Sequence, residues 1–387
     1  MKFYSLIVLC FITFLSYSQT IYKDTSSTKN NQQNAAQTIL QGALAKGLTV
    51  GGYAQVDYNQ PEGKNGKLDV HRLVLLFGYK FNDKVQFVTE IEFEHVKEVY
   101  VEQAFLNYSV HPNINIRGGL MLVPMGIVNE YHEPTTFNGV ERPNVDRSIV
   151  PSTWREIGVG LSGKLDNLSL RYQAYIFNGF ASVNGEKVLG GSNGLRNGRQ
   201  KGAESTINTP NFSTKIDYYG IPGLRLGASG YFGRSQAEDE VDDLEGTDVG
   251  ISMFGLDGRY LNGRFSARGQ YIHAIITDAD SYNNLFETDL GSELKGWYVE
   301  GAYNLLPIGN EQKLDAFVRY EQYDTHAATR NANISRNLSY DRQELTFGLS
   351  YHVAAGAVVK ADYQLLNNSN PGNTEKGQLN IGFGVWF

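Results

Sequence analysis

Hydrophobic and polar residues alternate along segments of roughly ten residues from Gly47 onward. The clearest such segments are 85–93, 170–176, 224–232, 264–271 and 344–352, where most apolar side chains are separated by one polar, charged or small residue. A period of two places successive side chains on opposite faces of a β-strand. Segments of this length and period are typical of strands that cross a membrane with one face in lipid and the other in water.

The connections between these segments differ in length in a regular way. Short connections are expected at 82–83, 112–113, 166–167, 221–223, 261–263, 308–310 and 354–356. Longer polar ones are expected at 60–66, 124–153, 181–208, 236–247, 277–293, 324–340 and 367–375, whereas the one at 94–98 is short. This pattern predicts an all-β fold, a transmembrane antiparallel β-barrel of about sixteen strands with short periplasmic turns and long extracellular loops. A barrel of that size encloses an aqueous channel.

The last strand places Leu379, Ile381 and Phe383 on one face, with Asn380 and small residues on the other. Together with the terminal aromatic Phe387, it resembles the signal by which outer-membrane proteins are recognised for assembly. We therefore expect Phe387 to act as an assembly signal for the barrel-assembly machinery. The alternative for this stretch alone is a half-buried edge strand in a soluble β-sandwich.

The N-terminal region does not follow the strand pattern. Lys2 precedes an apolar run to Leu15 and the small residues near Ser18, which predicts a secretory signal peptide over 1–18. Residues 19–46 form a polar leader, and 47–387 form the barrel domain. A short helical pattern within 35–44 could plug the lumen or support a trimer contact, but we expect a disordered leader. The single cysteine, Cys10, lies in the signal, so the mature chain has none.

Composition narrows the function classes. Charged residues make up 19% of the chain, and the mean hydropathy is -0.34, which excludes a bundle of apolar membrane helices. The net charge of -7 argues against nucleic acid as a partner, because such binding needs a basic face. Abundant Gly, Tyr and Phe (42, 24 and 20 residues) favour strands and turns.

The strand alternation assigns charged side chains of both signs to the inner face of the barrel. The predicted pore-lining residues are Arg72, Glu90, Glu92, Arg117, Arg171, Lys215, Arg225, Arg264, Arg268, Arg319 and Arg342. Cations spaced along one side of a channel would lower the barrier for anions. The alternative is a wall of mutually neutralising ion pairs with little selectivity, and the sequence leaves both open.

The segment Pro124–Thr153 is longer than an ordinary loop and holds four of the chain's ten prolines. Prolines stiffen a loop, and a stiff charged loop folded into a barrel narrows the channel. The predicted constriction residues are Glu130, His132, Glu133, Glu141, Arg142, Asp146 and Arg147. The alternative is a loop that caps the rim or braces a neighbouring subunit.

Signals for bond chemistry or cofactors are poor. The seven histidines are scattered, and none belongs to an HExxH motif or follows a GxSxG elbow. We therefore predict no catalytic residue, no cofactor and no metal site. Acidic residues within 238–248 could contact lipopolysaccharide through divalent ions, although a solvated loop is the simpler interpretation.

Residues Gly119–Gly126, with the sequence GLMLVPMG, resemble the Gly-X-Phe-Lys-X-Pro-Phe-Gly signature of the phosphate-selective porin O/P family. The stretches 129–131 and 154–160 are similar to family members as well. The resemblance implies a homotrimer of sixteen-stranded barrels that pass small anions such as phosphate. The signature lysine is Leu122 here, and an apolar side chain cannot hold phosphate. Strand alternation places Leu122 toward lipid, whereas the resemblance implies that this position lines the pore.

These observations predict a porin of the Gram-negative outer membrane, a passive channel for small hydrophilic solutes that weakly favours anions. Its expected surroundings are outer-membrane lipid and lipopolysaccharide. Two alternatives remain at this stage. One is an outer-membrane barrel hydrolase with a small site on its wall, and the other is a soluble secreted β-sandwich that binds glycans.

Overall fold

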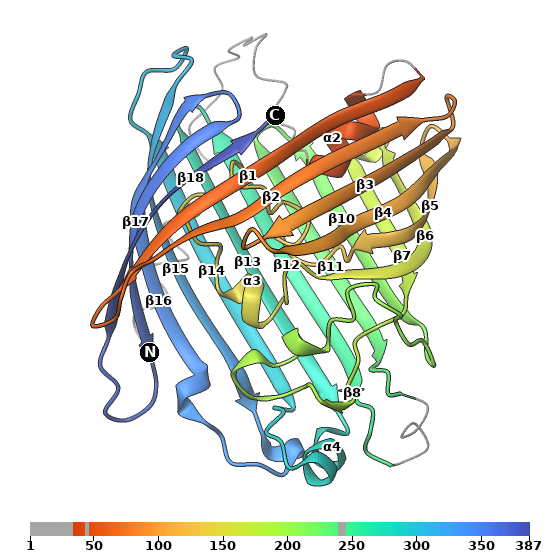
Figure 1. The fold of residues 1–387 in the computed structure, drawn as a ribbon, viewed down its shortest axis with the longest axis vertical. Helices are drawn as coiled ribbons and strands as arrows, with labels where there is room; N and C mark the ends of the chain where they lie inside the picture. The colour runs from red at the N-terminus through yellow and green to blue at the C-terminus, as the bar shows by residue number, and fades with distance from the viewer. Residues whose placement is uncertain (1–33, 43–45, 239–244) are drawn as a thin grey trace. The chain divides into compact units, whose positions relative to one another are not determined.

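Sixteen antiparallel strands form a closed barrel in the computed structural model of the chain (Figure 1). The structure describes residues 34–42, 46–238 and 245–387. The predicted signal peptide 1–18 and the first part of the polar leader lie outside these residues. The predicted all-β barrel and its strand number are therefore confirmed.

Each barrel strand pairs with its neighbours in the chain, and β1 pairs with β18 to close the cylinder. The barrel strands are β1 (Gly47–Pro61), β2 (Lys67–Lys80), β3 (Val85–Glu94), β4 (Glu98–His111), β5 (Ile114–Leu122), β6 (Arg155–Leu165), β7 (Leu170–Phe177), β10 (Asn211–Ile221), β11 (Leu224–Arg234), β12 (Gly250–Asn262), β13 (Phe265–Thr277), β14 (Glu293–Asn304), β15 (Lys313–Ala328), β16 (Asp341–Ala354), β17 (Ala357–Asn368) and β18 (Lys376–Trp386). Elsewhere lie the small hairpin β8 (Val183–Asn184) and β9 (Glu186–Lys187), the helices α2 (Ala35–Gly42), α3 (Val145–Ser148) and α4 (Ala279–Phe286), and the short 3-10 turns η3 (Asp166–Leu168), η4 (Gly191–Asn193), η5 (Arg196–Gly198), η6 (Arg330–Ala332) and η7 (Leu338–Tyr340).

The closing pair shows why the terminal strand has its sequence. Tyr53 of β1 lies opposite Trp386 of β18, and Asn59 lies opposite Asn380. The Gly52 amide donates to the Phe387 carbonyl at 2.9 Å, so the chain end extends the ladder. Closure leaves the sheet without an exposed edge, which a strand in lipid cannot tolerate.

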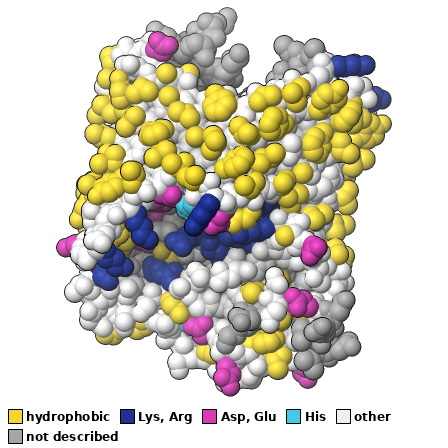
Figure 2. All heavy atoms as spheres, viewed as in Figure 1, with side chains coloured by type: hydrophobic (Ala, Val, Ile, Leu, Met, Phe, Trp, Pro, Cys, Tyr) yellow, Lys and Arg dark blue, Asp and Glu magenta, His cyan; other side chains and the backbone are white. Residues whose placement is uncertain are grey.

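The predicted alternation matches the exposure of side chains along the wall. On β18, Leu379, Ile381 and Phe383 are exposed, whereas Asn380 between them is completely buried. Figure 2 shows hydrophobic side chains in a broad band over the visible face, as expected for a surface that meets lipid. Among the described residues, no helix has the length and apolar character needed to cross a bilayer.

The connections also alternate as predicted. Tight turns join β2 to β3, β4 to β5 and each later pair up to β16 and β17, and the longer connections lie at the other end of the strands. The wall has unequal height, because β5 and β7 have 9 and 8 residues whereas β15 has 16. Residues 35–42 are helical rather than disordered: α2 buries Ala35, Ala36 and Ile39 near the tight-turn end of β2 and β3.

Candidate channel interior and mouth

The segment Pro124–Thr153 lies inside the barrel. Its backbone amides donate to side chains on three different strands: Ile127 to Gln270 of β13, Val145 to Glu321 of β15 and Val140 to Asp362 of β17, at 2.7, 3.0 and 2.6 Å. On another part of the wall, the ammonium group of Lys215 in β10 bonds to the Gly126 carbonyl. Contacts with strands on several sides place the segment across the interior, not over the rim.

Local sequence explains how the segment is held at its base. The Asn129 amide nitrogen donates to the carbonyls of Val123 and Trp154 at 2.7 and 2.9 Å, and its oxygen accepts from the Trp154 amide at 2.7 Å. One asparagine thus ties together the residue before the segment and the residue after it. Trp154 is fully buried and stacks on Phe180 with ring centroids 4.5 Å apart.

Acidic and histidine side chains of the segment are fastened to the wall and to α2. Glu130 lies 3.2 Å from the Lys215 ammonium group, and His132 lies 3.4 Å from Glu102 on β4. The others bond as follows: Glu133 accepts from the Ala35 amide of α2, Glu141 accepts from Asn59 at 2.8 Å, and Asp146 accepts from Gln270 at 2.8 Å. These contacts hold the segment in one arrangement, because each buried carboxylate needs a donor.

The inner wall carries cations that are paired with carboxylates. Lys215 also lies 3.6 Å from Asp257, and Arg225 lies 2.8 Å from Asp217. Arg268 and Arg319 share Glu300 at 2.8 and 3.4 Å. Paired charges of opposite sign cancel at a distance, so this part of the wall contributes little net field.

Most of the remaining predicted pore-lining residues on the inner face make polar or ring contacts. Glu90 accepts from the Tyr53 hydroxyl at 2.9 Å, and Arg72 donates to the His132 carbonyl at 2.6 Å. Glu92 is buried, Arg117 donates to Asn107 at 2.9 Å, Arg171 donates to the Tyr131 hydroxyl at 3.3 Å, and Arg342 lies 5.3 Å from the Tyr323 ring centroid.

Arg264 is a correction to the predicted set. It lies in the tight turn before β13, where its guanidinium donates to the carbonyls of Asn304 and Leu305 at 2.7 and 2.6 Å. The same group lies 4.8 Å from the Tyr303 ring centroid, and the Tyr303 side chain is on the exposed outer face. The alternation rule fails here because a side chain at the end of a strand can bend around the turn.

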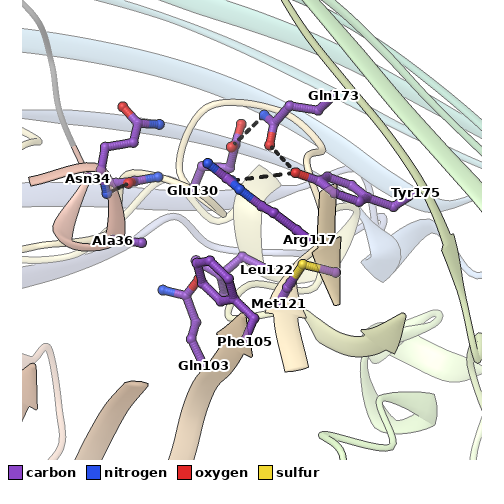
Figure 3. Close-up of a pocket in the computed structure, with 11 residues that line it drawn as sticks. Asn34, Ala36, Gln103, Phe105, Arg117, Met121, Leu122, Glu130, Gln173 and Tyr175 are labelled. Carbon is purple, nitrogen blue, oxygen red and sulfur yellow. Dashed lines mark hydrogen bonds between the residues drawn. The ribbon is translucent and has the colours of Figure 1, made fainter. Parts of the chain in front are cut away.

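Leu122 is a second correction, because it does not face lipid. Leu122 and its neighbour Met121 are both buried and both line an interior pocket with Phe105, Arg117 and Glu130 (Figure 3). Nearby Gly119 has a φ of +134°, a conformation that interrupts regular alternation and favours glycine. The resemblance therefore placed this position better than the strand pattern did.

A basic group lies at the long-loop end of the wall. Two of its members, Arg142 and Arg147, were predicted as constriction residues, and the other members were not predicted. This mouth cluster comprises Arg142, Arg147, Arg155, Arg196, Arg199 and Lys201. Arg196 and Arg199 donate only to backbone carbonyls, including Ser152 at 2.6 Å and Thr153 at 3.1 Å. Arg155 and Lys201 lie 5.6 and 5.0 Å from the Tyr100 ring centroid. Within the described parts of the chain, no member forms an ion pair with a carboxylate.

The cationic side chains of the mouth cluster repel one another. Burial and the neighbouring Arg147 and Arg142 groups lower the pKa of Arg196 to about 10. Burial and the adjacent Arg196 and Arg155 groups lower the pKa of Arg199 to about 9. Arg196 and Arg199 remain cationic at neutral pH, so a bound anion would relieve this repulsion. Figure 2 shows Lys and Arg side chains gathered in a hollow of the visible face, between the hydrophobic band and the atoms below it.

One sequence signal could have found part of this cluster. Arg196, Arg199 and Lys201 fall within six residues that contain no acidic side chain. Such a run inside a long connection indicates a local positive field. The spatial approach of Arg142, Arg147 and Arg155 could not be inferred from spacing.

Comparison with known proteins gives consistent matches. The family model described as phosphate-selective porin O and P matches residues 48–379. An uncharacterized protein of Aquifex aeolicus (strain VF5) is 34% identical over 345 residues, which cover 83% of this chain and 76% of that protein.

Solved outer-membrane barrels share the fold at low identity. The outer membrane channel DcaP of Acinetobacter baumannii superposes with a TM-score of 0.59 at 14% identity, covering 88% of this chain and 97% of that one. An anion-selective porin from Comamonas acidovorans gives 0.57 at 11% identity, with coverage of 89% and 100%. The trimer form of OmpT from Vibrio cholerae gives 0.56 at 16% identity, with the same coverage of 89% and 100%.

Proposed function

Since the chain belongs to the phosphate-selective porin O and P family and is an outer-membrane porin, we propose that its channel favours small anions and that the mouth cluster sets this preference. The main observation in support of this proposal is the contrast between two sets of cations. Lys215, Arg268 and Arg319 of the inner wall have carboxylate partners, whereas the mouth cluster has none among the described residues. A one-signed group of charges at an entrance raises the local concentration of counter-ions.

We also propose that the segment Pro124–Thr153 forms the constriction. Its contacts with β13, β15 and β17 support this role, because they hold the segment in the path of a solute. Helix α2 would narrow the same path near the tight-turn end, where Ile39 packs at Gly78. Conduction would then follow the space that these two elements leave along the wall.

The proposed solute class is small inorganic and organic anions, without strict selection for phosphate. Leu122 stands where the family signature has lysine, and its apolar side chain lines the interior pocket together with Glu130. Selective phosphate binding needs several donors directed at one anion. The mouth cluster supports attraction of anions in general, as in the anion-selective porin from Comamonas acidovorans.

We propose passive transport without bond chemistry, in a homotrimer that meets outer-membrane lipid and lipopolysaccharide. The porin family supports the first point, and the trimer form of the Vibrio neighbour supports the second. Phe387 remains our proposed signal for the barrel-assembly machinery. Within the acidic segment 238–248, Asp248 forms an ion pair with Arg234, and residues 239–244 lie outside the described residues. A catalytic role would require that substitution of the inner histidines abolish a measurable hydrolase activity.

The decisive experiment is the reversal potential of the protein in planar bilayers across a salt gradient. We expect anion preference in the wild type and a several-fold loss of that preference in the combined variant Arg196→Gln, Arg199→Gln and Lys201→Gln. The matched control is Lys84→Gln, an exposed cation in the short turn between β2 and β3. Cation preference in the wild type, or an unchanged preference in the triple variant, would overturn the proposal.

A further inference from the structure

One strand and a turn bring three potential metal ligands together at the long-loop end of β2. Asp69 and His71 lie two residues apart on β2, and His95 lies in the turn between β3 and β4. The His95 amide donates to the His71 carbonyl at 3.2 Å, and this hydrogen bond holds the turn next to β2. Consequently the two imidazole rings meet edge to face, with centroids 5.6 Å apart.

The donor atoms of these three residues converge. Nδ1 of His95 lies 2.6 Å from Oδ2 of Asp69, and Nδ1 of His71 lies 3.9 Å from the same oxygen. One donor from each residue lies within 4.8 Å of the other two. Tetrahedral zinc with bonds of about 2.0 Å separates its ligand atoms by about 3.3 Å, a value between the two distances seen here.

The turn that presents His95 has an unusual backbone. His95 and Val96 have φ values of 52° and 69°, in the left-handed region that β-branched residues avoid. Neither residue is glycine or asparagine, so the turn is held by its contacts and not by its own preference. Strained backbone of this kind clusters at active sites and ligand-binding segments.

We propose that Asp69, His71 and His95 bind a divalent transition-metal ion, with Zn²⁺ the best match. Two imidazole nitrogens and one carboxylate form a ligand set that suits zinc and does not suit Ca²⁺ or Mg²⁺, which prefer oxygen. The side chains of Asp69, His71 and His95 are 33%, 33% and 42% exposed, so small rotations can adjust the distances. That exposure also leaves room for a water molecule as the fourth ligand.

A hydrogen bond between His95 and Asp69 accounts for only part of this arrangement. The His71 ring makes no hydrogen bond among the described residues, yet it lies beside the pair. A second carboxylate, Glu94, has an oxygen 4.0 Å from Nε2 of His95 and can orient the ring or take part in binding. The three-ligand site explains why both imidazoles face one carboxylate.

The other converging group in the barrel behaves differently. Glu90, Glu102 and His132 are buried, and the Tyr53 hydroxyl bonds to Glu90 at 2.9 Å and to His132 at 3.0 Å. Gln103 also donates to Glu90 at 2.6 Å. These contacts fasten the interior segment to the wall, although Oε1 of Glu102 has no hydrogen-bond partner among the described residues. The group on β2 is partly exposed, so it is the one that an ion can reach from solution.

The test is a titration of the mature chain, without a polyhistidine tag, in detergent micelles. Calorimetry with Zn²⁺ should show saturable binding of one ion per chain, and Co²⁺ should give the visible absorption of a tetrahedral site. We expect His71→Ala and His95→Ala each to weaken Zn²⁺ binding about tenfold or more.

Two histidines on the same wall provide matched controls. His273 lies 3.1 Å from Glu293, and His352 lies 3.6 Å from Asp315, so among the described residues each has a single carboxylate partner and no second histidine beside it. His273→Ala and His352→Ala should leave Zn²⁺ binding unchanged. The absence of saturable binding in the wild type, or undiminished binding in His71→Ala, would overturn the proposal.

The same samples distinguish loss of ligands from loss of fold. Each variant should keep the anomalous migration of a folded barrel on an unheated gel. If His95→Ala does not fold, Asp69→Asn tests the same site without changing the turn. Reversal potentials are measured without Zn²⁺, so that a failure of the metal site and a failure of the proposed ion preference are distinguishable.

Discussion

The interior and the mouth of this barrel use the same residue types for different purposes. In the interior, Lys215 lies between Glu130 and Asp257, and Arg319 lies between Glu300 and Glu321. At the mouth, Arg196 and Arg199 donate to backbone carbonyls and repel each other. Fully buried charges are costly unless they are paired, whereas the partly exposed Arg196 and Arg199 can remain without a carboxylate partner. We infer that the interior cations hold the loop and the mouth cations act on solutes.

The largest expected effect comes from removing an interior cation. Lys215→Met leaves Glu130 and Asp257 without their shared partner, and breaking a buried pair in this way costs about 3–5 kcal/mol. We expect the barrel to lose its folded migration at a temperature several degrees lower than the wild type. The measurement is a series of gels from samples heated to increasing temperatures.

The control for this variant is Lys84→Met, which removes an exposed cation from a tight turn. It should melt as the wild type does, since exposed charges contribute little to stability. An equally stable Lys215→Met variant would show that the interior pair is not needed to hold the loop, which would break the comparison.

The next largest expected effect comes from displacing α2 in the barrel. An added Cβ at Gly78 would lie 2.0 Å from Cγ2 of Ile39, so Gly78→Val should displace the helix while valine remains well suited to a strand. We expect single-channel conductance to rise by a factor of roughly 1.2–2, with ion preference unchanged because the mouth cluster is intact. Deletion of residues 34–42 should give the same rise, and the combination should give no more.

Gly301→Val is the matched control, because a Cβ there meets nothing closer than 4.0 Å. Its conductance should equal that of the wild type. If Gly78→Val altered ion preference as strongly as conductance, selectivity would belong to the interior and the comparison would be wrong.

The fold could be predicted from the sequence because lipid and water impose a strict alternation on every strand. Leu379, Ile381 and Phe383 could be assigned to the outer face without any knowledge of their neighbours. The rule fails where the strand is no longer regular. Arg264 bends around a turn, and Leu122 follows a glycine with positive φ, so neither side chain points where simple alternation places it.

The site was less accessible to sequence analysis because it depends on how loops pack. Nothing in the spacing of Arg142, Arg155 and Arg199 shows that they meet at one end of the wall. For the same reason the sequence did not show whether residues 124–153 fold into the barrel. Their position is fixed by side chains far away in the sequence, such as Gln270 and Asp362. Long-range polar contacts of this kind leave no local pattern.

A change of salt concentration should separate the two regions further. The Debye length falls from about 10 Å at 0.1 M to about 3 Å at 1 M, so the field of a mostly half-buried cluster at the entrance is screened more than that of fully buried pairs. We expect anion preference, measured from reversal potentials at a fixed gradient ratio, to decline strongly between these concentrations. In the triple variant of Arg196, Arg199 and Lys201 the dependence on salt should be nearly flat. Preference that persists at 1 M in the wild type would assign selectivity to the interior.

The smallest expected effect comes from placing a cation in the interior pocket. Leu122→Lys restores the residue type of the family signature, and the new ammonium group would lie near Glu130 (Figure 3). Because that carboxylate can neutralise it, we expect anion preference to rise by less than about twofold. Leu122→Gln is the control that adds polarity without charge and should leave the reversal potential unchanged. If Leu122→Lys shifted the reversal potential more than the triple variant at the mouth does, the interior would set selectivity. One added cation in the interior would then have a larger effect than the removal of three cations at the entrance.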